Sequence, residues 1–500
     1  MNQSNSSGLS VKRLTGNRTT EYIITFLVVL ILFIIFRLLG FKNNGDAVKP
    51  IIMIALMCVG FYAFLKQKKQ QLSVDDIVNL IALAGMIIGV GYMLSTHIFE
   101  NGIDQGYVSA NARGHFGYIL NIVEGHLPNS NSEQFYQPPL VHSIAAIFVK
   151  LSLLFNGGDA EDAVQSVQIV NCTAMCFMMI AFRNFISEIN LDNKSKPYVM
   201  AMAAFFPNFY LMGCRANNDM FATYFMLLCV INTCRWYQKR DTKSIVFLAL
   251  SFGFGMMSKI SCGVVAFLTG PVMLYVLIKD IKAGNYKNTV MQLAIFAVIC
   301  LPLALWYPIR NMIMFGQSLT YVQRLDENIP IFTGKVPLYQ RMLRFSITAL
   351  MKKPFFVYPE FESVPEYLLK TSLFGEWSFK ANGPFGAIFL IVNLTAILAS
   401  AASCVYVTIK GKVIPAIYRF GFAALWVIEL ISYIQFNIQF PFICTADFRY
   451  VAVTELVGAI YLGYAIGLLR KDKNRKSAII SGALQILIIL FAFMTIAVFV

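Results

Sequence analysis

The sequence contains few charged residues. Only 13% of its 500 residues are Asp, Glu, Lys or Arg, whereas 57% are hydrophobic. Soluble domains carry roughly 25% charged residues, so the composition excludes a soluble globular protein, and its apolar content excludes a disordered one. Lys and Arg number 41 against 26 Asp and Glu. These cations are scattered along the chain instead of forming blocks, so their excess does not indicate a nucleic-acid partner.

The sequence also has no Cys-x-x-Cys pair, and we expect no cleavable leader. The ten cysteines lie mostly inside apolar segments and form no Cys-x-x-Cys pair, which argues against a disulfide framework or a zinc knuckle. Residues 1–19 are polar and do not contain the apolar core of a cleavable signal peptide. The apolar run that follows is too long for such a peptide, so we expect it to be retained as a membrane span.

Long apolar runs dominate the rest of the chain, and the mean hydropathy is +0.64. A helix needs about 20 apolar residues to cross a bilayer. Runs of this kind predict an all-α polytopic membrane protein with about 13 transmembrane helices. The predicted spans are 20–40, 50–66, 74–95, 161–182, 196–213, 218–236, 243–258, 261–279, 288–309, 384–409, 416–435, 449–469 and 477–499.

The distribution of Lys and Arg orients these spans. Most cations fall in short loops on one side if the N-terminus is cytoplasmic, as the positive-inside rule requires. Two long outer loops then remain, and loops of this length are usually functional. In the first, 111–125 predicts an amphipathic surface helix and 138–154 an interfacial helix. The predicted segments are the polar tail 1–19, N-terminal spans 20–95, first outer loop 96–160, spans 161–309, second outer loop 310–383 and C-terminal spans 384–500.

The first outer loop contains all four histidines of the chain, His97, His115, His126 and His142. Glu100 and Asp104 lie beside them. Histidine and carboxylate side chains can hold a divalent cation or transfer a proton near neutral pH. A polar loop also gathers such residues without any site, and the spacing matches no recognised metal motif. We therefore keep Glu100, Asp104 and His115 as catalytic candidates and as a possible metal-ligand set.

Polar residues recur where predicted helices end on the same outer side. Ionisable groups at membrane depth are costly, so they favour a functional site unless they reach the interface or cap a helix. Three of them are cations that would suit a lipid phosphate. The candidates are Asn218, Asp219, Lys259, Arg310, Asp447 and Arg449.

Five segments resemble, in the same order, the bacterial GT-C class of membrane glycosyltransferases near the protein O-mannosyltransferase family. They are GHFGYILNIVEGHLPN…QFYQPPLVHSIAA (114–146), RANNDMFATYFML (215–227), WYPIRNMIMFGQSLTYV (306–322), LLKTSLFGEWSF (368–379) and CTADFRY (444–450). The resemblance spans roughly 95–450. It implies an integral membrane enzyme of the bacterial plasma membrane, with a polyprenyl-phosphate sugar donor and an active site facing outside.

The resemblance also implies roles for individual residues. Glu100 or Asp104 would be the acid of the first loop. His115 and the turn at Gln137 would shape the site. The remaining site-lining residues would be His97, His142, Asn218, Asp219 and Asp447. The donor-phosphate contacts would be Lys259, Arg310 and Arg449.

The leading hypothesis is an inverting hexosyl- or pentosyltransferase that moves a sugar from the polyprenyl phosphate to a lipid-linked, cell-wall or protein acceptor. Membrane lipids are its other partners, and a divalent cation (Mg or Mn) is the one candidate cofactor. A lipid-linked-sugar flippase or transporter is the first alternative; it would need an internal repeat and ionisable residues at the bilayer midplane. A non-catalytic membrane homologue is the second, because Gln137 replaces the histidine that the family usually has before Pro-Pro-Leu.

Overall fold

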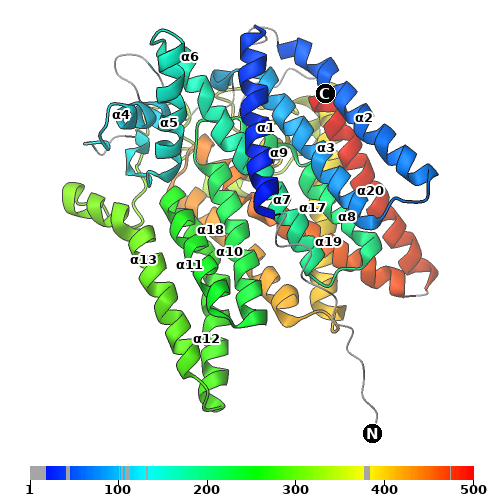
Figure 1. The fold of residues 1–500 in the computed structure, drawn as a ribbon. Helices are drawn as coiled ribbons and strands as arrows, with labels where there is room; N and C mark the ends of the chain where they lie inside the picture. Colours follow the sequence, from blue (N-terminus) through cyan, green and yellow to red (C-terminus); the bar gives the residue numbers. More distant parts are fainter. Residues whose placement is uncertain are drawn as a thin grey trace.

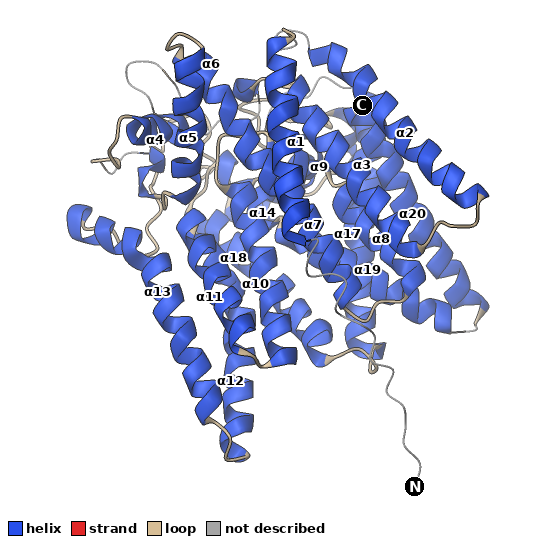
Figure 2. Cartoon of the chain, viewed as in Figure 1, coloured by secondary structure: helices blue, strands red, loops and turns tan. Residues whose placement is uncertain are grey.

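The computed structural model describes residues 18–40, 45–100, 102, 105–106, 108, 113–130, 133–376, 383–472 and 474–500. Its described part is built of helices and connecting loops, with no strand (Figure 2). The α-helices are α1 (Arg18–Leu38), α2 (Val48–Lys68), α3 (Val74–Ser95), α4 (Gly114–Val123), α5 (Leu140–Phe155), α6 (Ala160–Ala163), α7 (Val167–Glu188), α8 (Lys196–Ala204), α9 (Pro207–Gly213), α10 (Asp219–Lys239), α11 (Thr242–Ser258), α12 (Ala266–Lys282), α13 (Lys287–Phe315), α14 (Leu338–Leu343), α15 (Ile347–Lys352), α16 (Val364–Phe374), α17 (Gly383–Lys410), α18 (Phe422–Gln439), α19 (Val453–Lys471) and α20 (Arg475–Phe499).

The chain is an all-α polytopic membrane protein, as the sequence predicts. Ten helical segments of the described chain are long and apolar enough to cross a bilayer. They are Arg18–Leu38, Gly45–Lys68, Val74–Ser95, Ala160–Glu188, Ile260–Lys282, Lys287–Phe315, Gly383–Lys410, Ile417–Gln439, Val453–Lys471 and Arg475–Phe499.

Three of the predicted spans, 196–213, 218–236 and 243–258, are not among these ten. The run at 196–213 is divided into α8 and α9, because Pro207 begins a new helix after an extended Phe206. α11 has 17 residues, and α10 carries charged residues at both ends. Both helices nevertheless pack lengthwise in the bundle, α10 against α7 and α11, and α11 against α13. The total of about thirteen spans stays a prediction.

A cap that includes α4 and α5 covers one end of the bundle. α4 and α5 lie together there, while the connection from α12 to α13 projects from the opposite end (Figure 1). α4 falls within the predicted surface helix 111–125, yet its residues from His115 to Ile119 are buried, because α4 packs on α5 and on the short helix Glu133–Tyr136. α5 exposes a row of apolar side chains, Ile147, Leu151, Leu154 and Phe155, which suits the predicted interfacial position.

The helix before the second outer segment extends beyond the predicted span 288–309. α13 continues beyond residue 309 to Phe315, where Gly316 adopts a left-handed conformation (φ +66°) and ends the helix. The short helices α14, α15 and α16 follow. α16 packs against α9 and against the short helix Phe448–Val451, so the second outer segment and the loop before α19 meet next to the start of α10.

Candidate functional site

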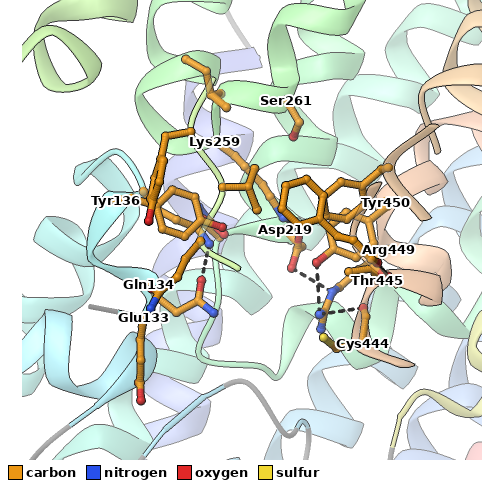
Figure 3. A pocket seen from close by; sticks show the side chains of 18 of the residues that line it. Glu133, Gln134, Tyr136, Asp219, Lys259, Ser261, Cys444, Thr445, Arg449 and Tyr450 are labelled. Atoms are coloured by element: carbon orange, nitrogen blue, oxygen red, sulfur yellow. Dashed lines mark hydrogen bonds and ion pairs between the residues drawn. The ribbon is translucent and has the colours of Figure 1, made fainter. Parts of the chain in front are cut away.

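A cavity of about 480 Å³ lies under the cap. Its walls come from segments that are far apart in the sequence. They include the start of α4, the turn at 133–138, the start of α10, the short helix Ile260–Val265, the end of α13 with the segment that follows it to 331, α18 and the segment 440–450. Polar side chains from most of these elements point into it (Figure 3). Ligand sites are typically concave spaces of this size with a few convergent polar groups. Six of the predicted site residues line the cavity: His115, Gln137, Asn218, Asp219, Lys259 and Arg449.

Buried amide side chains hold the start of α10 in place. Asn171 on α7 donates hydrogen bonds to the carbonyl oxygens of Arg215 (2.5 Å) and Asn217 (2.9 Å). Asn218 donates to the carbonyl oxygen of Ser258 (2.7 Å) and to the side chain of Gln137. These bonds join α7, α11 and the turn before α5 to the loop before α10. They thereby fix the direction in which Asp219 enters the cavity.

Asp219 lies between two cations. Its Oδ1 pairs with the ammonium of Lys259, and its Oδ2 lies 3.5 Å from Nε of Arg449 (Figure 3). The side chains of Asp219 and Arg449 are 5% and 2% exposed. Lys259 follows α11 directly, in extended backbone (φ −156°, ψ 129°). Because the helix ends there, its side chain reaches the cavity instead of the lipid face.

A second layer of ion pairs supports the first. Oε2 of Glu376 lies 3.1 Å from Arg215 and 3.3 Å from Arg449. Oδ2 of Asp447 lies 3.5 Å from Arg215, while its Oδ1 accepts the amide N–H of Arg449 (2.8 Å) and so begins the short helix Phe448–Val451. Glu376 and Asp447 are completely buried. These buried carboxylates are therefore paired, as groups removed from water must be.

Tyr450 completes the cationic wall. Nζ of Lys259 lies 4.7 Å, and the guanidinium carbon of Arg449 5.1 Å, from the centre of its ring. A cation over an aromatic face is attracted by the negative ring surface. The ring therefore holds both cations near the same point of the cavity surface, although their parent segments are far apart in the sequence.

Two of the predicted histidines, His115 and His142, pair with each other beside the cavity. Nδ1 of His115 lies 2.8 Å from Nε2 of His142, and the two rings are nearly parallel. Tyr118 stacks on the ring of His142 and donates its hydroxyl to the carbonyl oxygen of Gln137 (2.9 Å). Burial, and then the neighbouring His115, hold the pKa of His142 well below its usual range. His142 is therefore neutral at pH 7 and orients His115, which reaches the cavity.

Other predicted site residues lie elsewhere. Glu100 is exposed and does not line the cavity, and His97 lines a separate small cavity next to Arg37. The guanidinium of Arg310 donates to the carbonyl oxygen of Pro128 (2.9 Å) and lies over the ring of Tyr307. Asp447 supports Arg215 behind the cavity wall. Asp104 lies outside the described residues.

The predicted metal set is not assembled by the described residues. Within them, no three His, Cys, Asp or Glu side chains lie close enough together to hold a metal ion. Glu100 is not among the residues that line the cavity with His115. The set of Glu100, Asp104 and His115 stays a prediction because Asp104 is not described.

Sequence reasoning missed several residues of the site, among them Arg215, Glu376, Glu429 and Tyr450. Arg215 and Glu376 lie inside quoted motif segments, RANND and FGEW. Neither was assigned a role, because a charged residue in a predicted loop looks solvated. Glu429 interrupts the apolar run of α18 and lines the cavity. A lone carboxylate in a membrane span was the signal that could have found it.

Comparisons with known proteins agree with the resemblance. A family model described as dolichyl-phosphate-mannose-protein mannosyltransferase matches residues 136–306. This stretch includes Gln137, Asn218, Asp219 and Lys259, whereas Glu376 and Arg449 lie beyond it. A search of curated protein sequences gives no match.

Two solved structures have a fold similar to that of this chain. The archaeal oligosaccharyltransferase AglB from Archaeoglobus fulgidus, in complex with an inhibitory peptide and a dolichol-phosphate, is 13% identical with a TM-score of 0.43; the match covers 84% of this chain and 55% of that one. ArnT from Cupriavidus metallidurans, bound to undecaprenyl phosphate, is 13% identical with a TM-score of 0.36 and 78% coverage of each chain. The chain thus spans about half the length of the archaeal protein.

The predicted resemblance is confirmed over the part of the chain that carries the start of α10 and Lys259. The chain is a polytopic helical membrane protein that resembles the GT-C class of polyprenyl-phosphate-sugar-dependent glycosyltransferases near the protein O-mannosyltransferase family.

Proposed function

We propose that this chain is an inverting GT-C-type glycosyltransferase. It moves a hexose or pentose from a polyprenyl-phosphate donor to a lipid-linked, cell-wall or protein acceptor at the non-cytoplasmic face of a bacterial plasma membrane. The single observation that carries the proposal is the cavity in which Lys259 and Arg449 meet on Asp219. The family match over residues 136–306 supports the same reaction class.

The two cations suit the leaving group. In the transfer, an acceptor oxygen attacks the anomeric carbon, the bond from that carbon to the phosphate oxygen breaks, and polyprenyl phosphate leaves with the bonding electrons. Cations positioned where negative charge develops lower the barrier of such a step. Lys259 and Arg449 both line the described cavity, which supports the proposal that they contact the donor phosphate. Arg310 was also predicted for this role, but its guanidinium is engaged at Pro128.

The acceptor must lose a proton, and Asp219 is the carboxylate closest to the proposed phosphate site. Lys259 and Arg449 neutralise the carboxylate of Asp219. A donor phosphate competes for the same two cations, so its arrival leaves the carboxylate more basic. We therefore propose Asp219 as the base within the described part of the chain, with His115 beside it as a site-shaping residue. Asp104 stays the alternative base from the first outer loop.

The test is a donor-cleavage assay on the purified full-length chain in lipid nanodiscs. The donors are radiolabelled polyprenyl-phosphate hexoses and pentoses, and a membrane extract supplies the acceptor. Loss of label from the lipid, absent in D219N, supports transfer. A parallel sample of the chain in closed vesicles tests the flippase, which is supported if the label stays on the lipid but crosses the bilayer. Label that does neither, in folded protein, supports the non-catalytic homologue. A parallel sample with a chelator measures the need for a divalent cation.

A further inference from the structure

The cavity wall contains one buried acidic side chain that the proposed reaction does not use. Glu429 lies on α18, lines the cavity and is 3% exposed. Its carboxyl group makes no hydrogen bond or ion pair with any residue that the structure describes, and its Oε1 is completely enclosed. A buried carboxyl group without a partner is costly. Since protein closes its other sides, a partner can reach it from the cavity.

Two further polar side chains near Glu429 could bind a polar ligand. Ser432 lies on the same face of α18, and Ser261 lies on the short helix Ile260–Val265, which packs against α18. Both hydroxyl groups line the cavity without a hydrogen bond to a described residue. Tyr433 also lines it, but its hydroxyl is committed to the carbonyl oxygen of Ala446 (2.7 Å). A carboxylate and two hydroxyl groups are thus available to a ligand.

The charge of the cavity indicates which ligand. Lys259 and Arg449 lie in the same space, so a cationic ligand would be repelled on entry. A neutral ligand rich in hydroxyl groups can donate to the carboxylate and exchange hydrogen bonds with Ser261 and Ser432. Aromatic rings are also present, since Phe436 and Tyr450 line the cavity. A sugar has hydroxyl groups, which can bond to the carboxyl and serine groups, and apolar C–H faces, which can pack on the aromatic rings.

A second membrane carboxyl provides a contrast. Glu455 on α19 is 7% exposed and likewise has an enclosed Oε1 without a hydrogen bond. It does not line the cavity that Glu429 lines. Glu429 is therefore not unusual in lacking a partner. It differs from Glu455 because it also lines the cavity.

We propose that Glu429 binds hydroxyl groups of the sugar carried by the lipid donor and so determines which sugar is accepted. The proposal rests on the function proposed above, since it assumes that the donor phosphate lies at Lys259 and Arg449. Glu429 would contact the sugar on the side of the cavity formed by α18. It is a specificity-determining residue and takes no part in bond making.

The test compares two lipids, polyprenyl phosphate and the sugar-bearing donor that the cleavage assay identifies. Binding is measured on the full-length chain in nanodiscs, without acceptor. E429A is expected to weaken binding of the sugar-bearing lipid about tenfold or more, since the hydrogen bonds between the sugar hydroxyl groups and the buried carboxyl group are lost. Binding of polyprenyl phosphate should stay within twofold of wild type. E429Q keeps one acceptor oxygen and should lose less than E429A. E455Q should bind both lipids as the wild type does.

The other outcomes separate the two proposals. Equal weakening for both lipids in E429A, in protein with an unchanged Tm, would give Glu429 a general packing role and overturn the inference. Unchanged binding of the sugar-bearing lipid in E429A and E429Q would overturn it as well, and would leave the proposed transferase standing. A wild-type chain that binds neither lipid would contradict the proposed function and this inference with it.

Discussion

Asp219 at the start of α10 and Arg449 before α19 face each other across the cavity wall, with Oδ2 of the aspartate 3.5 Å from Nε of the arginine. The two residues are far apart in the sequence and both are buried. Asp219 also pairs with Lys259, so one carboxylate is shared by two cations. The arrangement keeps the cations inside a membrane protein before any ligand arrives, since unpaired charges there would be costly.

The first prediction concerns Lys259. K259Q should weaken binding of polyprenyl phosphate at least about tenfold, because a charge-assisted contact to phosphate is removed. The matched control is R310Q, which removes a cation that binds the Pro128 carbonyl and does not line the cavity. R310Q should bind polyprenyl phosphate within twofold of wild type. Equal losses in both variants would argue that the phosphate lies nearer to α13 than we propose.

The second prediction concerns Arg215, which neutralises Glu376 and Asp447 behind the cavity. R215L leaves these buried carboxylates short of a cation, and removing one partner of a buried pair costs about 3–5 kcal/mol. We expect a clear fall in the Tm of the detergent-solubilised protein. K49A breaks a surface pair with Asp46 and should leave Tm unchanged. If R215L unfolds at the wild-type temperature, the ion-pair layer does not support the fold.

The sequence predicted much of this site because membrane helices make ionisable residues conspicuous. Asp219, Lys259 and Arg449 each stand at the edge of an apolar run, and the number of spans places all three on one side. Their mutual pairing could not be predicted, since it depends on how α10, α11 and α19 pack. Glu376 was missed for a different reason. It lies in a polar loop, and only the meeting of α16 with the segment before α19 buries it.

The same limits explain the misplaced residues. Arg310 was expected just after a helix end, but it lies inside α13, and its guanidinium donates to a carbonyl oxygen of the cap. Position along a helix does not determine the direction of a long side chain. The division of 196–213 into two helices, unlike the direction of Arg310, could have been predicted, because Pro207 is evident in the sequence. Hydropathy alone predicted one continuous span, whereas proline chemistry ends the helix before it.

The third prediction concerns pH. Burial, and to a smaller extent the hydrogen bond with the Glu362 side chain, raise the pKa of Glu366 to about 7. The pKa of a glutamate in an unfolded chain is about 4.3. The folded state therefore holds this proton more tightly, so its contribution to stability is fully present below about pH 4.3 and is lost as the pH rises through about 7. E366Q cannot ionise, and its side-chain oxygen can still accept the amide N–H of Ser346.

We therefore expect the Tm of the wild type to fall more steeply than that of E366Q between pH 5 and 8. Thermal unfolding in detergent at a series of pH values measures this slope. E360Q alters an exposed neighbour that pairs with Lys353 and should retain the wild-type slope. Parallel curves for wild type and E366Q would show that Glu366 does not titrate in this range.

The fourth prediction concerns the histidine pair. H142F keeps an aromatic ring against Tyr118 but removes the nitrogen that lies 2.8 Å from Nδ1 of His115. If His142 orients His115 for the reaction, kcat should fall severalfold while KM for the donor stays near its wild-type value. The pH profile of kcat should shift as well, because the proton position on His115 is no longer fixed. A matched loss in KM and kcat with an unchanged pH profile would indicate a packing role only.

The most direct test of the central claim is donor turnover in D219N. The purified chain is supplied with a radiolabelled polyprenyl-phosphate sugar and the membrane extract, and release of label from the lipid is followed over time. The account predicts turnover by the wild type and a loss of at least about 100-fold in D219N, with polyprenyl phosphate still bound. Wild-type turnover that persists undiminished in D219N would contradict it.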